Sequence, residues 1–285
     1  MVDCRVLSTA PLLVVVDDAV SSEDCELLIA TSKRRAPQVV TSKQEEKPGF
    51  TSSSTTMHNY QLPTTLASRT ADETAALERV STLVERLLQC THASGETQTV
   101  RRTESSATRG LSLGLHVDTN LKPRRFATAL LYLRDVPHGG GGETVFPLCG
   151  LAVQHPVAAA AQALIDAGCS HTRRPPADLQ SEADMLRMAA LRTLARAQRS
   201  DVASADGEEK LPLSGGGIAV SPRRGRLVLF FSRRDDGEVD GMSWHGGADC
   251  TAEQEKWTLQ LFKEVPEEVA DVASYVCERR AAFRT

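Results

Sequence analysis

The stretch FATALLYL (residues 126–133) is an almost continuous run of apolar residues near the middle of the chain. Such a run is typical of a strand that is buried on both faces. Downstream, ETVFP (143–147) begins a second predicted strand after the turn PHGGGG (137–142), and RLVLFF (226–231) predicts a third. The centre of the chain is therefore expected to be a body of short strands.

The regions around this body predict further strands and several helices. Thr70 and Glu73 form a capping box before an apolar pattern spaced by three and four residues, which predicts a helix over 71–90. A second helix is expected after Ser21, and residues 35–70 are expected to be loops with one strand near 57–62. Other predicted strands cover 11–16, 97–102, 111–117, 217–220, 243–245 and 256–262. The Ala-rich segment 150–217 is expected to be a helical insertion, and 266–283 a terminal helix.

This order of elements predicts an α+β protein that is mainly β. N-terminal helices are expected to pack on one side of an antiparallel sandwich or jelly roll. Apolar residues make up 41% of the 285 residues and charged residues 25%, which is ordinary for a globular protein.

The net charge and the cysteine content indicate which classes of partner the protein can bind and which cellular compartment it occupies. The net charge of −4 and the pI of about 6.0 argue against a protein that binds nucleic acid through phosphate contacts. The seven cysteines are scattered without a C-x-x-C pair, which favours reduced thiols over a disulfide framework. PLLVVV (11–16) is too short to span a membrane, and no signal peptide is recognisable. A cytoplasmic protein with no membrane or nucleic-acid partner is expected.

Chemistry-bearing residues gather in LGLHVDTN (113–120), where His116 and Asp118 are two residues apart. At the end of a strand both side chains would point to one face. His245, in MSWHGG, is the best candidate for a third ligand from a distant strand. Two histidines and one carboxylate are typical of non-haem Fe(II) oxygenases, which keep the other metal positions open. His138 and His155 have no partner at ligand spacing and are expected to be loop histidines.

Four blocks of the sequence resemble, in order, the signature blocks of the prolyl 4-hydroxylase-like Fe(II)/2-oxoglutarate dioxygenases. They are LHVD, RRFATALLYLRDVPHGGGGETVFP, GIAVSPRRGRLVLFF and DGMSWHGGADCTAEQEKW. The resemblance covers residues 8–147 and 217–263. It implies a single domain over 1–285 with a double-stranded β-helix barrel, interrupted by the insertion 150–217 and followed by a tail, 264–285.

The resemblance also implies roles for individual residues. His116, Asp118 and His245 would bind Fe(II), and Lys256 would pair with the distal carboxylate of 2-oxoglutarate. Tyr132 and Thr144 would add hydroxyl groups to the same cosubstrate site. The expected residues of the substrate groove are Arg125 and Trp244.

The activity implied is hydroxylation of a proline residue in a peptide or protein with O₂, releasing succinate and CO₂, with ascorbate as reductant. One departure lies at Leu113, where the family carries a tyrosine that hydrogen-bonds the cosubstrate. A 2-oxoglutarate oxygenase acting on another amino acid, a small molecule or an alkylated base is an alternative, although the acidic pI disfavours the base. A non-catalytic binding module that kept the fold is another.

Overall fold

The structure is a computed structural model that describes residues 3–44, 53–62, 69–90, 98–105, 110–119, 122–199, 216–251 and 253–284. Its largest element is an eight-stranded antiparallel sheet in the order β1-β2-β9-β6-β11-β5-β4-β3. The strands are β1 (Arg5–Thr9), β2 (Leu12–Val16), β3 (Gln38–Gln44), β4 (Ser53–Gln61), β5 (Thr99–Ser105), β6 (Arg125–Tyr132), β9 (Leu227–Phe231) and β11 (Glu255–Glu264).

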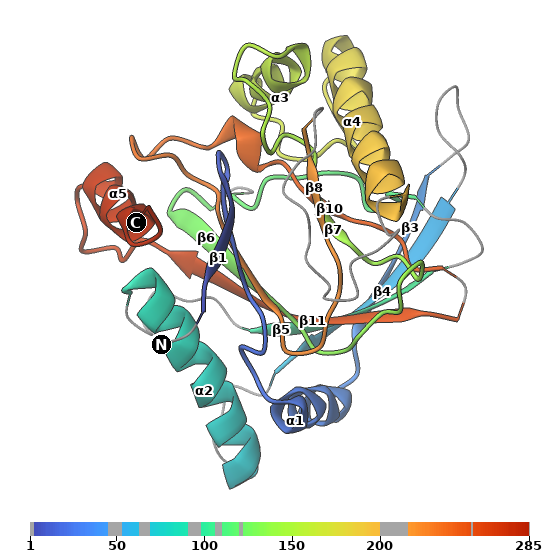
Figure 1. Ribbon diagram of the computed structural model, residues 1–285, viewed down its shortest axis with the longest axis vertical. Coiled ribbons are helices and arrows are strands. Elements are labelled where there is room, and N and C mark those ends of the chain that lie inside the picture. Colours follow the sequence, from blue (N-terminus) through green and yellow to red (C-terminus); the bar gives the residue numbers. More distant parts are fainter. Residues whose placement is uncertain are drawn as a thin grey trace.

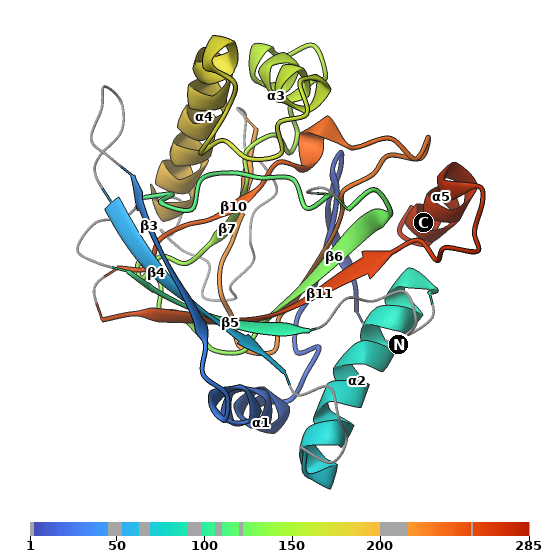
Figure 2. The same ribbon diagram turned by 180° about the vertical axis from the view of Figure 1, so that it is seen from behind.

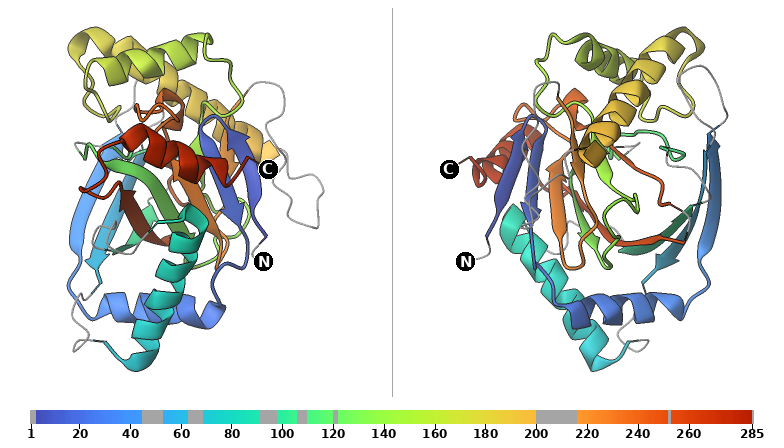
Figure 3. Two further views of the ribbon diagram at one scale, coloured as in Figure 1. Left: turned by 90° about the vertical axis from the view of Figure 1, so that its left-hand side faces the viewer. Right: turned by 45° about the vertical axis from the view of Figure 1, so that its right-hand side comes forward.

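A small antiparallel sheet faces the large one (Figure 3). It has the order β10-β7-β8, with β7 (Thr144–Phe146), β8 (Ile218–Val220) and β10 (Gly246–Gly247). Residues 115–117 extend it, since His116 pairs with His245 in an antiparallel bridge. The central strands β9-β6-β11-β5 and this small sheet form a jelly roll, as the sequence predicts.

Helices cover the outer faces of both sheets (Figures 1 and 2). On the large sheet lie α1 (Ser22–Lys33), α2 (Ala71–Leu88) and α5 (Val272–Ala281), which share one apolar core with β2, β6, β9 and β11. On the small sheet lie α3 (Pro156–Asp166) and α4 (Gln180–Arg199) of the insertion, which share a second core with it. None of the helices in the described ranges has the length and apolar character needed to cross a membrane.

Local signals explain where the helices begin. Thr70 and Glu73 form the predicted capping box at the start of α2, and the Ser21 hydroxyl accepts a hydrogen bond from the Asp24 amide at the start of α1. The sequence missed β1 and β3. Both are edge strands, and the polar composition of β3 (QVVTSKQ) hides the alternation that marks a strand.

The expected strand over 111–117 is shorter than predicted. The Gly114 amide donates to the Leu111 carbonyl in a turn, and Gly114 has a φ of +67°. A Cβ at this position would lie 2.9 Å from the side chain of Arg173, so only glycine fits without displacing a neighbour. Regular pairing is therefore confined to the residues after this turn.

The insertion adds an edge to the small sheet as well as covering it. The Val117 amide donates to the Ser170 carbonyl, and the Thr172 amide donates to the Leu115 carbonyl. The buried Thr172 hydroxyl also accepts from the Leu115 amide at 2.9 Å. The segment 115–117 is thus held between His245 on one side and the insertion on the other.

Replacing Thr172 with valine tests this attachment. Valine keeps the shape of the side chain but leaves the buried Leu115 amide without its acceptor, which costs about 1–3 kcal/mol. We expect the free energy of unfolding, measured in urea, to fall by that amount. Thr74→Val, at a partly exposed position of α2, is the control and should change it by less than about 0.5 kcal/mol. Equal effects of the two substitutions would contradict the attachment.

Candidate metal centre

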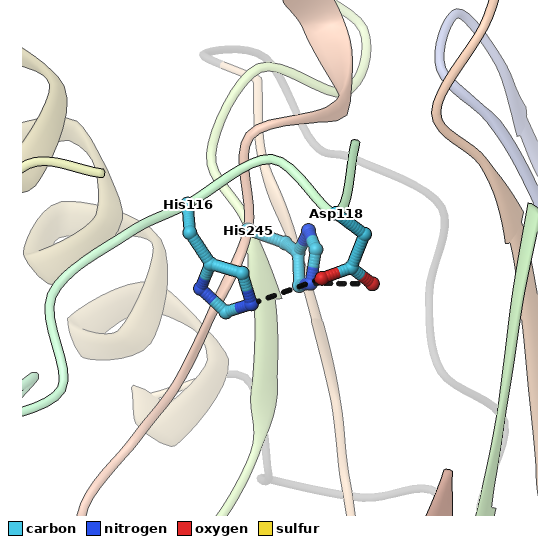
Figure 4. Close-up of side chains that lie close together, drawn as sticks. All are labelled: His116, Asp118 and His245. Atoms are coloured by element: carbon cyan, nitrogen blue, oxygen red, sulfur yellow. Dashed lines mark ion pairs between the residues drawn. The ribbon is translucent and has the colours of Figure 1, made fainter. Parts of the chain in front are cut away.

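Three side chains from two distant segments meet inside the jelly roll (Figure 4). His116 and His245 are brought together by their backbones, since the amide of each donates to the carbonyl of the other at 2.9 Å. Asp118 lies two residues beyond His116 and points the same way. His116 Nε2 is 3.2 Å from Asp118 Oδ1, and His245 Nε2 is 3.6 Å from Asp118 Oδ2.

Neighbouring groups fix the orientation of these side chains. His245 Nδ1 lies 3.0 Å from the Ser243 carbonyl, which can only accept, so Nδ1 carries the proton and Nε2 offers a lone pair. The His245 ring stacks on Phe146 and meets Phe230 edge-on. The Thr128 hydroxyl donates to Asp118 Oδ2 at 2.6 Å.

The protonation states suit metal binding. Burial lowers the pKa of His245 to about 4, which keeps its imidazole neutral at physiological pH. Burial raises the pKa of Asp118, but its electrostatic interaction with His245 and its contacts with His116 and Thr128 more than offset this and hold the pKa well below its usual range. Asp118 is therefore an anion beside the neutral imidazole of His245, as a divalent cation requires.

The donor set fits Fe(II). One ligand atom from each of His116, Asp118 and His245 lies within 4.8 Å of the other two. These form the only group of three or more such ligands among the described residues. Two imidazoles and one carboxylate on one side of an ion match the facial arrangement of non-haem iron sites. A closed tetrahedral zinc site would need a fourth ligand.

A buried lysine without an anionic partner faces the same interior. Lys256 is 7% exposed, and no carboxylate of the described residues lies within ion-pair distance of its ammonium. Burial lowers the pKa of Lys256 to about 8, while the nearby Cys250 and Glu143 raise it. Burying a cation without an anionic partner is costly, so this position suits an anionic ligand.

Tyr132 and Thr144 lie beside Lys256 and form a chain of hydrogen bonds with it. Lys256 Nζ donates to the Thr144 hydroxyl at 3.3 Å, the two hydroxyls of Thr144 and Tyr132 are 2.6 Å apart, and Tyr132 donates to the Val220 carbonyl at 3.0 Å. Because a lysine ammonium has three N–H donors, further donors remain for a ligand.

The two expected groove residues are both buried. Trp244 is fully buried among the insertion helices, and its indole N–H donates to the Ala161 carbonyl. It follows that Trp244 does not line an open groove, and this expectation is wrong. Arg125 is 7% exposed and donates to the Asp118 carbonyl at 2.6 Å, with its guanidinium 3.9 Å from the centre of the Phe262 ring. Arg125, at the start of β6, thus stabilises the position of the candidate ligand Asp118.

Sequence reasoning missed three residues near the site. Asp249 is buried and accepts hydrogen bonds from the amide and hydroxyl of Ser112, which fixes the turn before His116. His171 of the insertion stacks on His116, with ring centroids 5.8 Å apart. Arg101 lies on β5 opposite Thr258 of β11, close enough to Asp118 for their charges to interact. The alternation of β5 could have revealed Arg101, whereas no local signal marks the other two.

No protein-family model matches this chain, and no curated protein matches its sequence. Matching solved structures include the viral collagen prolyl hydroxylase vCPH from Paramecium Bursaria Chlorella virus-1 in complex with 2OG, with 13% identity over 89% of this chain and 96% of that one and a TM-score of 0.44. A prolyl-4-hydroxylase from Pseudomonas putida matches with 15% identity, 89% and 93% coverage and a TM-score of 0.41. HygX from Streptomyces hygroscopicus with nickel, 2-oxoglutarate and hygromycin B matches with 12% identity, 92% and 86% coverage and a TM-score of 0.44.

The unpaired charge of Lys256 predicts an unusual dependence of stability on pH. Below pH about 8 the lysine is protonated in both the folded and the unfolded chain, so the full cost of burying it is present. Between pH about 8 and 10.5 only the unfolded chain keeps the proton, so stability rises with pH. Without ligands, Lys256→Met should therefore be more stable than the wild type at pH 7, by about 3 kcal/mol at most, and the gap should narrow toward pH 10.

Lys263→Met is the matched control on the same strand. Lys263 is also buried, but its ammonium lies 3.9 Å from a carboxylate oxygen of Glu85. Removing it leaves Glu85 without this partner and should lower the free energy of unfolding. The measurement is urea denaturation between pH 7 and 10. A destabilised Lys256→Met protein at pH 7 would show that Lys256 is already compensated in the ligand-free protein.

Proposed function

We propose that this chain is a prolyl 4-hydroxylase-like Fe(II)- and 2-oxoglutarate-dependent dioxygenase that hydroxylates a proline residue in a peptide or protein. The observation that carries the proposal is the unpaired, buried Lys256 in the same interior as a two-histidine, one-carboxylate cluster. 2-Oxoglutarate fits both features, because its keto-acid end can chelate a metal while its distal carboxylate pairs with an ammonium group. The jelly roll and the four sequence blocks around these residues support the same assignment.

The bound Fe(II) would supply the chemistry that activates O₂, so that one oxygen atom hydroxylates the substrate while 2-oxoglutarate becomes succinate and CO₂. The chain's own residues provide geometry. His116, Asp118 and His245 would hold the ion on one side and leave the other side open. Thr128 and Arg125 keep Asp118 in place through hydrogen bonds to its carboxylate and its carbonyl.

The cosubstrate site would be built around Lys256. Because Tyr132 donates to the Val220 carbonyl, the Thr144 hydroxyl donates its one proton to Tyr132 and accepts from Lys256. Thr144 and Tyr132 would therefore contribute by orienting the ammonium, with the Tyr132 ring 5.3 Å from Lys256 Nζ. Leu113 is only partly buried and cannot replace the hydroxyl that the family places at this position. Lys256 is therefore expected to carry most of the cosubstrate affinity.

Turnover is the direct test of this function. The protein is incubated with Fe(II), ascorbate, O₂, labelled 2-oxoglutarate and proline-rich peptides, and succinate release is measured together with a gain of one oxygen atom by the peptide. His116→Ala should lower succinate release by at least about 100-fold, because two ligands hold the metal poorly. The exposed His138 is the matched control, and His138→Ala should keep wild-type turnover. Absence of turnover in the wild type would favour a binding module.

Lys256→Met separates cosubstrate binding from metal binding. Loss of the ammonium should raise the KM for 2-oxoglutarate by at least about 10-fold, since a hydrogen bond to a charged group contributes about 1.5–3 kcal/mol. Binding of Mn(II) in place of Fe(II), followed by electron paramagnetic resonance, should be unchanged. Succinate release with no hydroxylated peptide would leave the cosubstrate assignment standing and favour a different primary substrate, such as another amino acid or a small molecule.

A further inference from the structure

A cavity of about 530 Å³ opens on the inner face of β4, β5 and β11. This volume is in the range of small-ligand sites. Its lining is polar, with four amide side chains, one hydroxyl and two arginines, and it contains no carboxylate. The lining residues are Arg35, Ala36, Gln38, Asn59, Gln61, Thr99, Arg101, Gln260 and Phe262.

Two residues that line the cavity, Phe262 and Arg101, connect it to the metal centre. Phe262 lines the cavity, and its ring packs under the guanidinium of Arg125, which donates to the Asp118 carbonyl. Arg101 lines it from β5, next to Thr258 of β11, and lies close enough to feel the charge of Asp118. A molecule bound in the cavity would therefore lie within range of the charge of Asp118.

Among the described residues, the two arginines of this cavity lack acidic partners. Arg101 is partly buried, and its Nε donates to the neutral Asn59 side chain at 2.8 Å. Arg35 is exposed at the rim. In the ranges described by the structure, neither guanidinium has a carboxylate within ion-pair distance. The planar guanidinium favours carboxylates, which it can bind through two parallel hydrogen bonds.

We propose that this cavity binds the primary substrate through a carboxylate that pairs with Arg101, so that the preferred peptide carries an acidic residue beside the target proline. This inference rests on the proposed function, which supplies the peptide. A carboxylate could also come from 2-oxoglutarate. Lys256 is the cation available for 2-oxoglutarate. Separate KM values for the peptide and for 2-oxoglutarate show which of the two carboxylates pairs with Arg101.

The test compares two proline peptides that differ only by a Glu or a Gln next to the proline. With the wild-type protein, the Glu peptide should have a KM at least about 10-fold lower than the Gln peptide. Arg101→Gln should remove this preference and raise the KM for the Glu peptide alone. Arg102→Gln is the matched control, because Arg102 lies on the opposite face of β5, where it pairs with Glu104 and Glu255. It should keep the preference for Glu.

Either of two kinetic results would overturn the proposal. The first is equal KM values for the two peptides with the wild-type protein. The second is an increase in the KM for 2-oxoglutarate, and not for the peptide, in Arg101→Gln, which would assign Arg101 to the cosubstrate.

Binding of fluorescently labelled Glu and Gln peptides, measured by anisotropy, needs no turnover. If hydroxylation fails but the Glu peptide binds at least about 10-fold more tightly in an Arg101-dependent way, the proposed function fails while the anion site stands. Equal binding overturns the site.

Discussion

The metal centre depends on the pairing of two backbone segments, at His116 and His245. Each residue donates its amide to the carbonyl of the other, and in an antiparallel ladder such opposed residues point their side chains to the same face. Asp118 joins them because alternate residues of an extended segment share a face. One pairing therefore determines the positions of all three metal donors, and everything that stabilises it also stabilises the site.

The alternation of side chains along each strand also gives the large sheet an apolar outer face and a polar inner face. On β11, Trp257, Leu259 and Leu261 point outward into the apolar core under α1, α2 and α5. Lys256, Thr258 and Gln260 point inward, where the candidate cosubstrate and substrate sites lie. Burial of the outer face provides stability that does not depend on the inner face. The inner face can therefore carry polar and charged groups whose partners are ligands.

This alternation also marks the limit of what the sequence could predict. Counting along the strand places Lys256, Thr258 and Gln260 on one face, whereas the position of Lys256 at the cosubstrate was implied by the family resemblance alone. The capping box of α2 was visible in four residues. Adjacent residues of an extended segment point to opposite faces, so Trp244 should point away from the face that carries His245. The expectation that Trp244 lines the substrate groove neglected this alternation. In the structure Trp244 packs against the insertion. β3 could not be recognised because an edge strand needs no alternation of apolar residues.

Contacts between distant segments were beyond the reach of sequence patterns. Nothing near Asp249 indicates that its carboxylate accepts from Ser112, and nothing near His171 indicates that it stacks on His116. Such pairs are set by the path of the chain through the two sheets. Local propensity describes each element separately, whereas a buried hydrogen bond between elements depends on their final arrangement.

The insertion gives the small sheet the support that its short strands lack. Strands of two or three residues form few ladder hydrogen bonds, and a sheet of this size is weak unless its faces and edges are covered. Helices α3 and α4 cover its outer face with an apolar core that includes Trp244, and the segment around Thr172 pairs with the edge at Leu115. Because this edge carries His116 and leads to Asp118, substitutions in the insertion can alter the metal site through geometry alone.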